Sequence, residues 1–291
     1  MARTIIGVAI TNTSMRYEYI SDIERARALG LASPRARTAH LHILDGKPLI
    51  GASTAVGVVG GADGLMQWYA DMAAVAGLKL PQQDVSGAYD AANAIQDKDE
   101  RRKAKSALDK TYPDYADARR AATQNRDKAA TKGTLRHGTL EDYIRHCLNN
   151  NKGVPMKATH ESIQMFIDWS LENVAKFYFT EANCYDELLW VGGIADIGLQ
   201  MKDGKNLIGD HKSSREAFPK QFLQAALYDV LLSHSGILDS QGNKLDDWKP
   251  ADGIVIFPFR SEPFTPEYKW DIAKWRKGAE DAVNLYKLIS I

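Results

Sequence analysis

The strongest structural signal in the sequence is Val191-Gly-Gly-Ile-Ala-Asp196, followed after a short interval by Leu207-Ile-Gly-Asp210-His-Lys212. Residues 190–201 are mostly apolar, residues 207–212 begin with Leu-Ile, and Asp203-Gly204 between the two segments is a hairpin turn signal. The sequence therefore predicts two neighbouring antiparallel strands, each carrying an aspartate near its far end.

Regular elements are predicted on both sides of this hairpin. Helices are expected at 134–147, 161–177, 218–232 and 269–289, and strands at 178–189 and 253–259. This order predicts a mixed α/β fold, with a central mixed β-sheet flanked by helices. Asp45-Gly46, inside the run Thr38–Ile50, predicts a further hairpin. Residues 1–128 are interpreted as an N-terminal α/β extension and residues 129–291 as the core.

The composition is that of an ordinary globular protein. The chain has 291 residues, of which 44% are hydrophobic and 25% charged, which argues against the disordered and membrane classes. No segment approaches the roughly 20 apolar residues of a membrane span, and the apolar run Ile5–Ile10 is too short for a signal peptide. The two cysteines give no disulfide framework. A cytoplasmic protein without a membrane partner is expected.

Positive charge is concentrated in one stretch although the net charge of the chain is zero. Asp97–Arg136 is polar and helical in character, with an expected break near Pro113, and contains twelve Lys/Arg against seven Asp/Glu. Such a stretch is either a solvated helix face or a contact to the DNA backbone, for which Arg101, Arg102 and Lys103 are the candidates.

The main candidate catalytic residues lie on the predicted hairpin. Side chains alternate across a strand, so Asp210 and Lys212 project from one face and His211 from the other. If Asp196 lies alongside, two carboxylates repel one another unless a cation joins them. Magnesium, held by oxygen ligands, would relieve the repulsion and activate water for phosphodiester hydrolysis. The alternative is a surface hairpin whose Asp-x-Lys forms a solvated ion pair.

Two flanking helices supply further candidates. His137 and Glu141 lie four residues apart, so they share one helix face and could provide a metal ligand and a catalytic or supporting carboxylate. Gln224 and Tyr228 also lie one turn apart, either as core residues or at the catalytic face.

These motifs together resemble the PD-(D/E)XK nuclease superfamily, in particular its RecB-like exonuclease branch. The matching segments are Gly133-Thr-Leu-Arg-His137-Gly-Thr-Leu-Glu141, Gly193-Ile-Ala-Asp196, Asp210-His-Lys212-Ser213-Ser214 and Gln224-Ala-Ala-Leu-Tyr228. The likeness covers residues 129–289. It implies Mg²⁺ or Mn²⁺ held by His137, Asp196, Asp210 and the His211 carbonyl, whose side chain should point into the opposite layer. It also implies catalysis by Asp196, Asp210, Lys212 and Glu141, and substrate binding by Gln224 and Tyr228.

Two motifs that the sequence lacks limit the cofactors and activities that we expect. An iron–sulfur cluster of this branch needs four cysteines, so none is expected with two. No Walker motif is present, so a helicase or recombination partner would be a separate protein. A DNA exonuclease in end processing, recombination or phage DNA metabolism is expected, since the N-terminal region loosely resembles phage-borne members. A structure- or site-specific endonuclease and a non-catalytic DNA-end-binding protein remain alternatives, and a homo-oligomer remains open.

Overall fold

A computed structural model describes residues 16–34, 36, 38–59, 88, 91–92, 94–158, 160–259 and 264–290, with the backbone alone at 115 and 119–136. The chain divides into two compact units, one of residues 1–59 and 138–291 and the other of residues 60–137. This grouping differs from the division expected near residue 128, because the first 59 residues belong with the C-terminal half.

The main unit is built on a mixed sheet, as the sequence predicts. Its strands follow the order β11 (Glu267–Lys269), β10 (Gly253–Pro258), β7 (Asn206–Lys212), β6 (Val191–Met201), β5 (Val174–Asp186), β8 (Ile237–Leu238) and β9 (Lys244–Asp246). Strands β10 and β7 run parallel, whereas β5, β6 and β7 form an antiparallel meander. The short strand β4 (Ile50–Gly51) adds to β6 in parallel.

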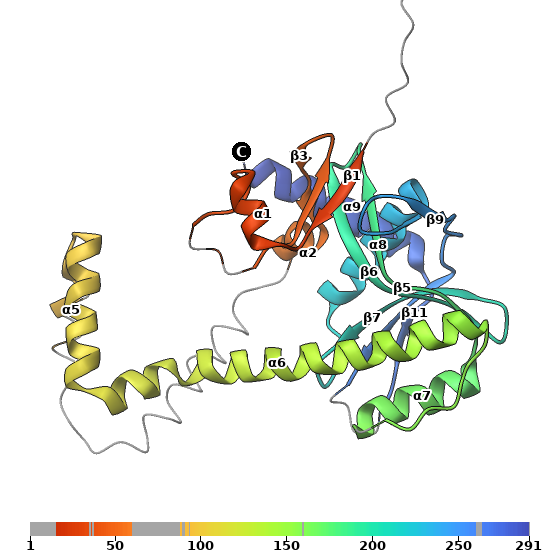
Figure 1. The fold of residues 1–291 in the computed structure, drawn as a ribbon, viewed down its shortest axis with the longest axis horizontal. Coiled ribbons are helices and arrows are strands. Elements are labelled where there is room, and N and C mark those ends of the chain that lie inside the picture. Colours follow the sequence, from red (N-terminus) through yellow and green to blue (C-terminus); the bar gives the residue numbers. More distant parts are fainter. Residues whose placement is uncertain are drawn as a thin grey trace, which may run out of the picture. The chain divides into compact units, whose positions relative to one another are not determined.

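Helices cover both faces of this sheet (Figure 1). Helices α8 (Pro219–Ser235) and α9 (Ile272–Ile289) bury their apolar residues against one face. Helix α7 (Glu161–Asn173) and the part of α6 (Pro113–Asn150) that follows Gly138 pack on the other. Strand β7 is buried on both sides, with Ile208 in the α8 layer and Leu207 in the α7 layer. The alternation along β7 therefore sends neighbouring side chains into different layers.

The N-terminal residues contribute to the same unit. Strands β1 (Tyr17–Ile20), β2 (Leu41–Leu44) and β3 (Lys47–Pro48) form a small sheet, and α1 spans Ile23–Ala28. The predicted hairpin turn is confirmed, since Asp45 and Gly46 have φ values of 49° and 75°. Helix α2 (Ala52–Ala55) and the 3-10 turn η1 (Val56–Val59) place Ala52, Ala55 and Val56 in the core beneath α8.

The second unit contains the basic stretch. Helix α5 spans Lys98–Thr111, and the Asp97 side chain caps it by accepting hydrogen bonds from two backbone N–H groups. The predicted break is confirmed, because Tyr112 leaves helical geometry and Pro113 begins α6. Helix α5 has no buried residue. None of the described helices combines the length and apolarity that crossing a bilayer requires. The apolar run at 5–10 lies outside the described residues.

Candidate metal and catalytic site

Asp210 and Lys212 form a buried ion pair at the end of β7. Lys212 Nζ lies 2.6 Å from Asp210 Oδ2, the carboxylate has no exposed surface, and 24% of the lysine side chain is exposed. Burial raises the pKa of Asp210 well above its usual range, Lys212 opposes that shift, and Asp196 adds to it. Burial would lower the pKa of Lys212, but the Asp210 and Asp196 carboxylates outweigh it and raise this pKa. The two carboxylates and the ammonium thus act on one another, as the hairpin motif predicts.

Asp196 lies beside this pair on the neighbouring strand. The ladder between β6 and β7 ends at Ile197 and Gly209, so Asp196 and Asp210 are the next residues along each strand. The His211 backbone N–H donates to Asp196 Oδ2 at 3.1 Å. The pleat changes here: Ala195 packs in the α8 layer but Ile197 in the α7 layer. Their partners on β5 are Ala182 and Thr180, and Glu181 between these partners has a φ of 52°. Asp196 therefore stands where its strand changes face.

The imidazole ring of His211 approaches Asp196 from the face of the sheet opposite Asp210. As alternation predicts, the ring points into the layer opposite Asp210, where it stacks on Phe259 and meets Phe166 edge-on. His211 Nδ1 is 3.8 Å from Asp196 Oδ2. Ligand atoms of His137, Asp196 and His211 all lie within 4.8 Å of one another. Sequence reasoning used only the His211 carbonyl and missed its ring as a possible ligand.

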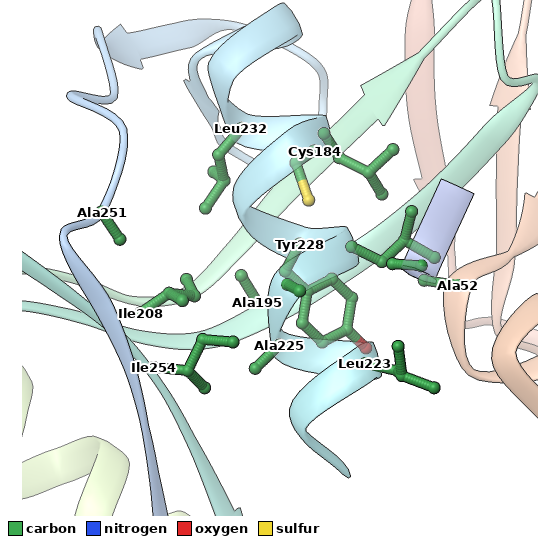
Figure 2. Close-up of a cluster of buried hydrophobic side chains, with 14 of the residues drawn as sticks. Ala52, Cys184, Ala195, Ile208, Leu223, Ala225, Tyr228, Leu232, Ala251 and Ile254 are labelled. Atoms are coloured by element: carbon green, nitrogen blue, oxygen red, sulfur yellow. The ribbon is translucent and has the colours of Figure 1, made fainter. Parts of the chain in front are cut away.

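Gln224 and Tyr228 extend the site along α8. Lys212 Nζ donates to Gln224 Oε1 at 3.5 Å, and Gln224 Nε2 donates to the Tyr228 hydroxyl at 2.9 Å. The Tyr228 ring is 5% exposed and lies among apolar side chains (Figure 2). Burial, and then the Asp196 charge, raise the pKa of Tyr228 well above its ordinary value. Tyr228 is therefore a core residue, and Gln224 links its hydroxyl to the Lys212 ammonium.

Two glycines on β6 allow neighbouring side chains to approach the strand closely. A Cβ at Gly193 would lie 2.5 Å from Tyr228 Cε1, and one at Gly192 would lie 2.6 Å from His42 Cβ. Both distances are shorter than carbon atoms tolerate. The glycines preceding Asp196 are thus required by close contacts on β6, one with α8 and one with β2.

The remaining predicted residues have other contacts in the structure. Glu141 is paired with Arg145 one helical turn further along α6, with Oε1 and Nη2 2.5 Å apart. Arg101, Arg102 and Lys103 are on α5 in the second unit, where Arg101 donates to the Ile95 carbonyl and Arg102 pairs with Asp99.

Comparison with known proteins adds no assignment: no protein-family model matches the chain, and no curated protein matches its sequence.

Proposed function

We propose that the chain is a metal-dependent nuclease that hydrolyses phosphodiester bonds in DNA, with the core of the PD-(D/E)XK superfamily. The observation that carries the proposal is the convergence of Asp196, Asp210 and Lys212 from adjacent strands. An Asp210 carboxylate whose pKa is raised by burial and by Asp196, with an ammonium beside it, suits a divalent cation and an anionic substrate.

The residues present fit a divalent cation. Asp196 offers a carboxylate oxygen, and His137 and His211 offer ring nitrogens close to it. Carboxylates suit Mg²⁺ and Mn²⁺, while imidazoles favour transition metals. The donor set therefore suits Mn²⁺ better than Mg²⁺. A bound ion would supply Lewis acidity for the attack of water on phosphorus.

The side chains of the chain have separable tasks in this proposal. Asp210 holds the Lys212 ammonium in place through their ion pair. Lys212 presents a fixed positive charge to the phosphate, whose negative charge grows in the transition state. The Arg101, Arg102 and Lys103 side chains on α5 would contact the DNA backbone outside the reacting group.

A cleavage assay tests this function. Wild-type protein, with Mg²⁺ or Mn²⁺ and with chelator, is incubated with linear duplex DNA and with covalently closed circular DNA. Digestion of linear DNA that needs metal is expected, and Asp210→Asn should reduce it by about 10³-fold. Asp203→Asn, in the exposed turn between β6 and β7, is the matched control. Equal activity in Asp210→Asn and wild type would refute the proposed site.

The circular substrate separates the two modes of cleavage. An exonuclease, the form we propose, leaves closed circles intact, whereas an endonuclease nicks or linearises them. DNA binding without cleavage in any divalent metal would instead favour a DNA-end-binding protein. We place this activity in the cytoplasm, in DNA end processing or recombination.

A further inference from the structure

Gln224 lies between a lysine and a tyrosine, and the hydrogen bonds determine its orientation. An ammonium has only donors, so the Gln224 carbonyl oxygen must face Lys212. The amide nitrogen then faces Tyr228, whose hydroxyl oxygen accepts its hydrogen bond. Reversing the amide would set its N–H groups against the ammonium and lose the contact with Lys212, and the Tyr228 hydroxyl would have to turn and donate to the amide oxygen.

Tyr228 is held so that its hydroxyl has one position. The ring touches Gly193 on β6 and is packed in the apolar layer under α8 (Figure 2). A side chain this enclosed presents almost no surface to a DNA strand.

We propose that Gln224 and Tyr228 are positioning residues for the Lys212 ammonium rather than residues that contact DNA. This inference rests on the proposed nuclease function for its catalytic meaning. Tyr228 holds the Gln224 amide, Gln224 holds one N–H of Lys212, and Asp210 holds another. In the part of the chain that the structure describes, these contacts use two of the three ammonium N–H groups. The third is directed to a phosphate oxygen of the substrate.

The positioning role predicts a particular division between kinetic constants. Tyr228→Phe removes only the hydroxyl oxygen, so the Gln224 amide loses one of its two hydrogen bonds and is held less firmly, while the ring still fills its place. We expect kcat to fall by about 10- to 100-fold, because small displacements of a catalytic group have effects of this size. KM, and the Kd for DNA measured without metal, should stay within twofold of wild type.

A nuclear magnetic resonance measurement reports on the same contacts without using activity. The lysine side chains are labelled with ¹⁵N. An ammonium held by two acceptors exchanges its protons with water slowly enough to give a separate signal. The signal of Lys212 is assigned as the one that disappears in Lys212→Gln. The signal should be present in wild type and broadened or lost in Tyr228→Phe and Gln224→Met. Tyr178→Phe is the matched control, because it also removes one partly buried tyrosine hydroxyl bond, to Asn206.

The outcomes separate this inference from the proposed function. Loss of the signal together with a fall in kcat at constant KM supports it. A raised KM or Kd at constant kcat means that the residues bind DNA, which overturns it, as does an unchanged Lys212 signal in Tyr228→Phe. Wild-type protein that cuts no DNA overturns the nuclease proposal, whereas the dependence of the signal on Tyr228 still decides the positioning contact.

Discussion

The ring of Tyr228 on α8 lies where any side chain at Gly193 on β6 would have to be, with 2.5 Å between an added Cβ and Tyr228 Cε1. Gly193→Ala should therefore destabilise the fold by about 1–3 kcal/mol, as overpacking of a filled core does. Denaturant unfolding measures this. Gly138→Ala in α6 is a control of opposite sign, since nothing lies within 4 Å of its added Cβ and alanine should gain about 0.5–1 kcal/mol. Equal stability of Gly193→Ala and wild type would contradict the contact.

The Asp210–Lys212 pair predicts an asymmetry between two variants. Lys212→Met leaves the buried Asp210 carboxylate beside Asp196 without its cation and should lower the free energy of unfolding by about 1–3 kcal/mol in metal-free buffer. Asp210→Asn removes the repulsion with Asp196, so its stability should equal or exceed that of Lys212→Met. Thermal unfolding with chelator compares them. A less stable Asp210→Asn would show that attraction outweighs repulsion in this cluster.

The position of the His211 ring leads us to predict that the site prefers Mn²⁺ to Mg²⁺. His211→Phe retains an aromatic ring between its phenylalanine neighbours but removes both nitrogens, so Mn²⁺ affinity should fall at least tenfold, about 1.4 kcal/mol. Mg²⁺, which prefers oxygen, should be affected less. Calorimetric titration measures both ions. His146→Phe, at an exposed position of α6, is the control, and equal Mn²⁺ affinity in both variants would remove His211 from the ligand set.

His42 predicts acid sensitivity of the fold. Burial, and then the neighbouring His40, lower the pKa of His42 from 6.5 to about 4. The folded state therefore favours the neutral ring, and stability present above pH 6.5 is lost as the pH falls towards about 4. The loss should approach about 3 kcal/mol. Unfolding of His42→Gln across this range should depend less on pH than that of wild type, whereas His146→Gln, at an exposed residue of α6, should follow wild type.

The basic helix α5 predicts salt-dependent DNA binding. Reversing Arg101, Arg102 and Lys103 to glutamate should weaken binding at low salt and reduce the slope of log K against log salt by about 0.9 for each lost phosphate contact. Fluorescence anisotropy with labelled duplex DNA measures this. Reversal of Lys274, Lys277 and Lys287 on α9 changes the net charge equally and is the control. If both triple variants bind alike, α5 is simply a solvated helix.

Local patterns predicted most of the sheet and its helices. The strands expected at 190–201 and 207–212 are found at Val191–Met201 and Asn206–Lys212, because alternation and the Asp203-Gly204 turn are local properties. The addition of β4 to β6, and the packing of α2 beneath α8, were missed. These contacts join segments more than a hundred residues apart, and two-residue strands leave no periodicity to read.

The candidate site, like the fold, could be predicted in part from local sequence patterns. Spacing alone places Asp210 and Lys212 on one face, and this is what β7 does. The approach of the His211 ring to Asp196 was not foreseen, because it depends on the change of pleat opposite Glu181 rather than on regular alternation. The role of Gly193 was equally hidden, since the residue that requires it lies on another element.

The division of the chain decides how it can be shortened. If residues 1–128 were an N-terminal extension, they could be removed without loss of the core. Their removal would instead take away β4 and the apolar residues that α2 and η1 place against α8. The internal segment 60–137 forms its own unit within a main unit that continues at Gly138, and its last residue is the candidate metal ligand His137. A minimal fragment that keeps the whole site would accordingly join two distant pieces of the chain. The second piece would begin ahead of His137, with a linker in place of the rest of the internal segment.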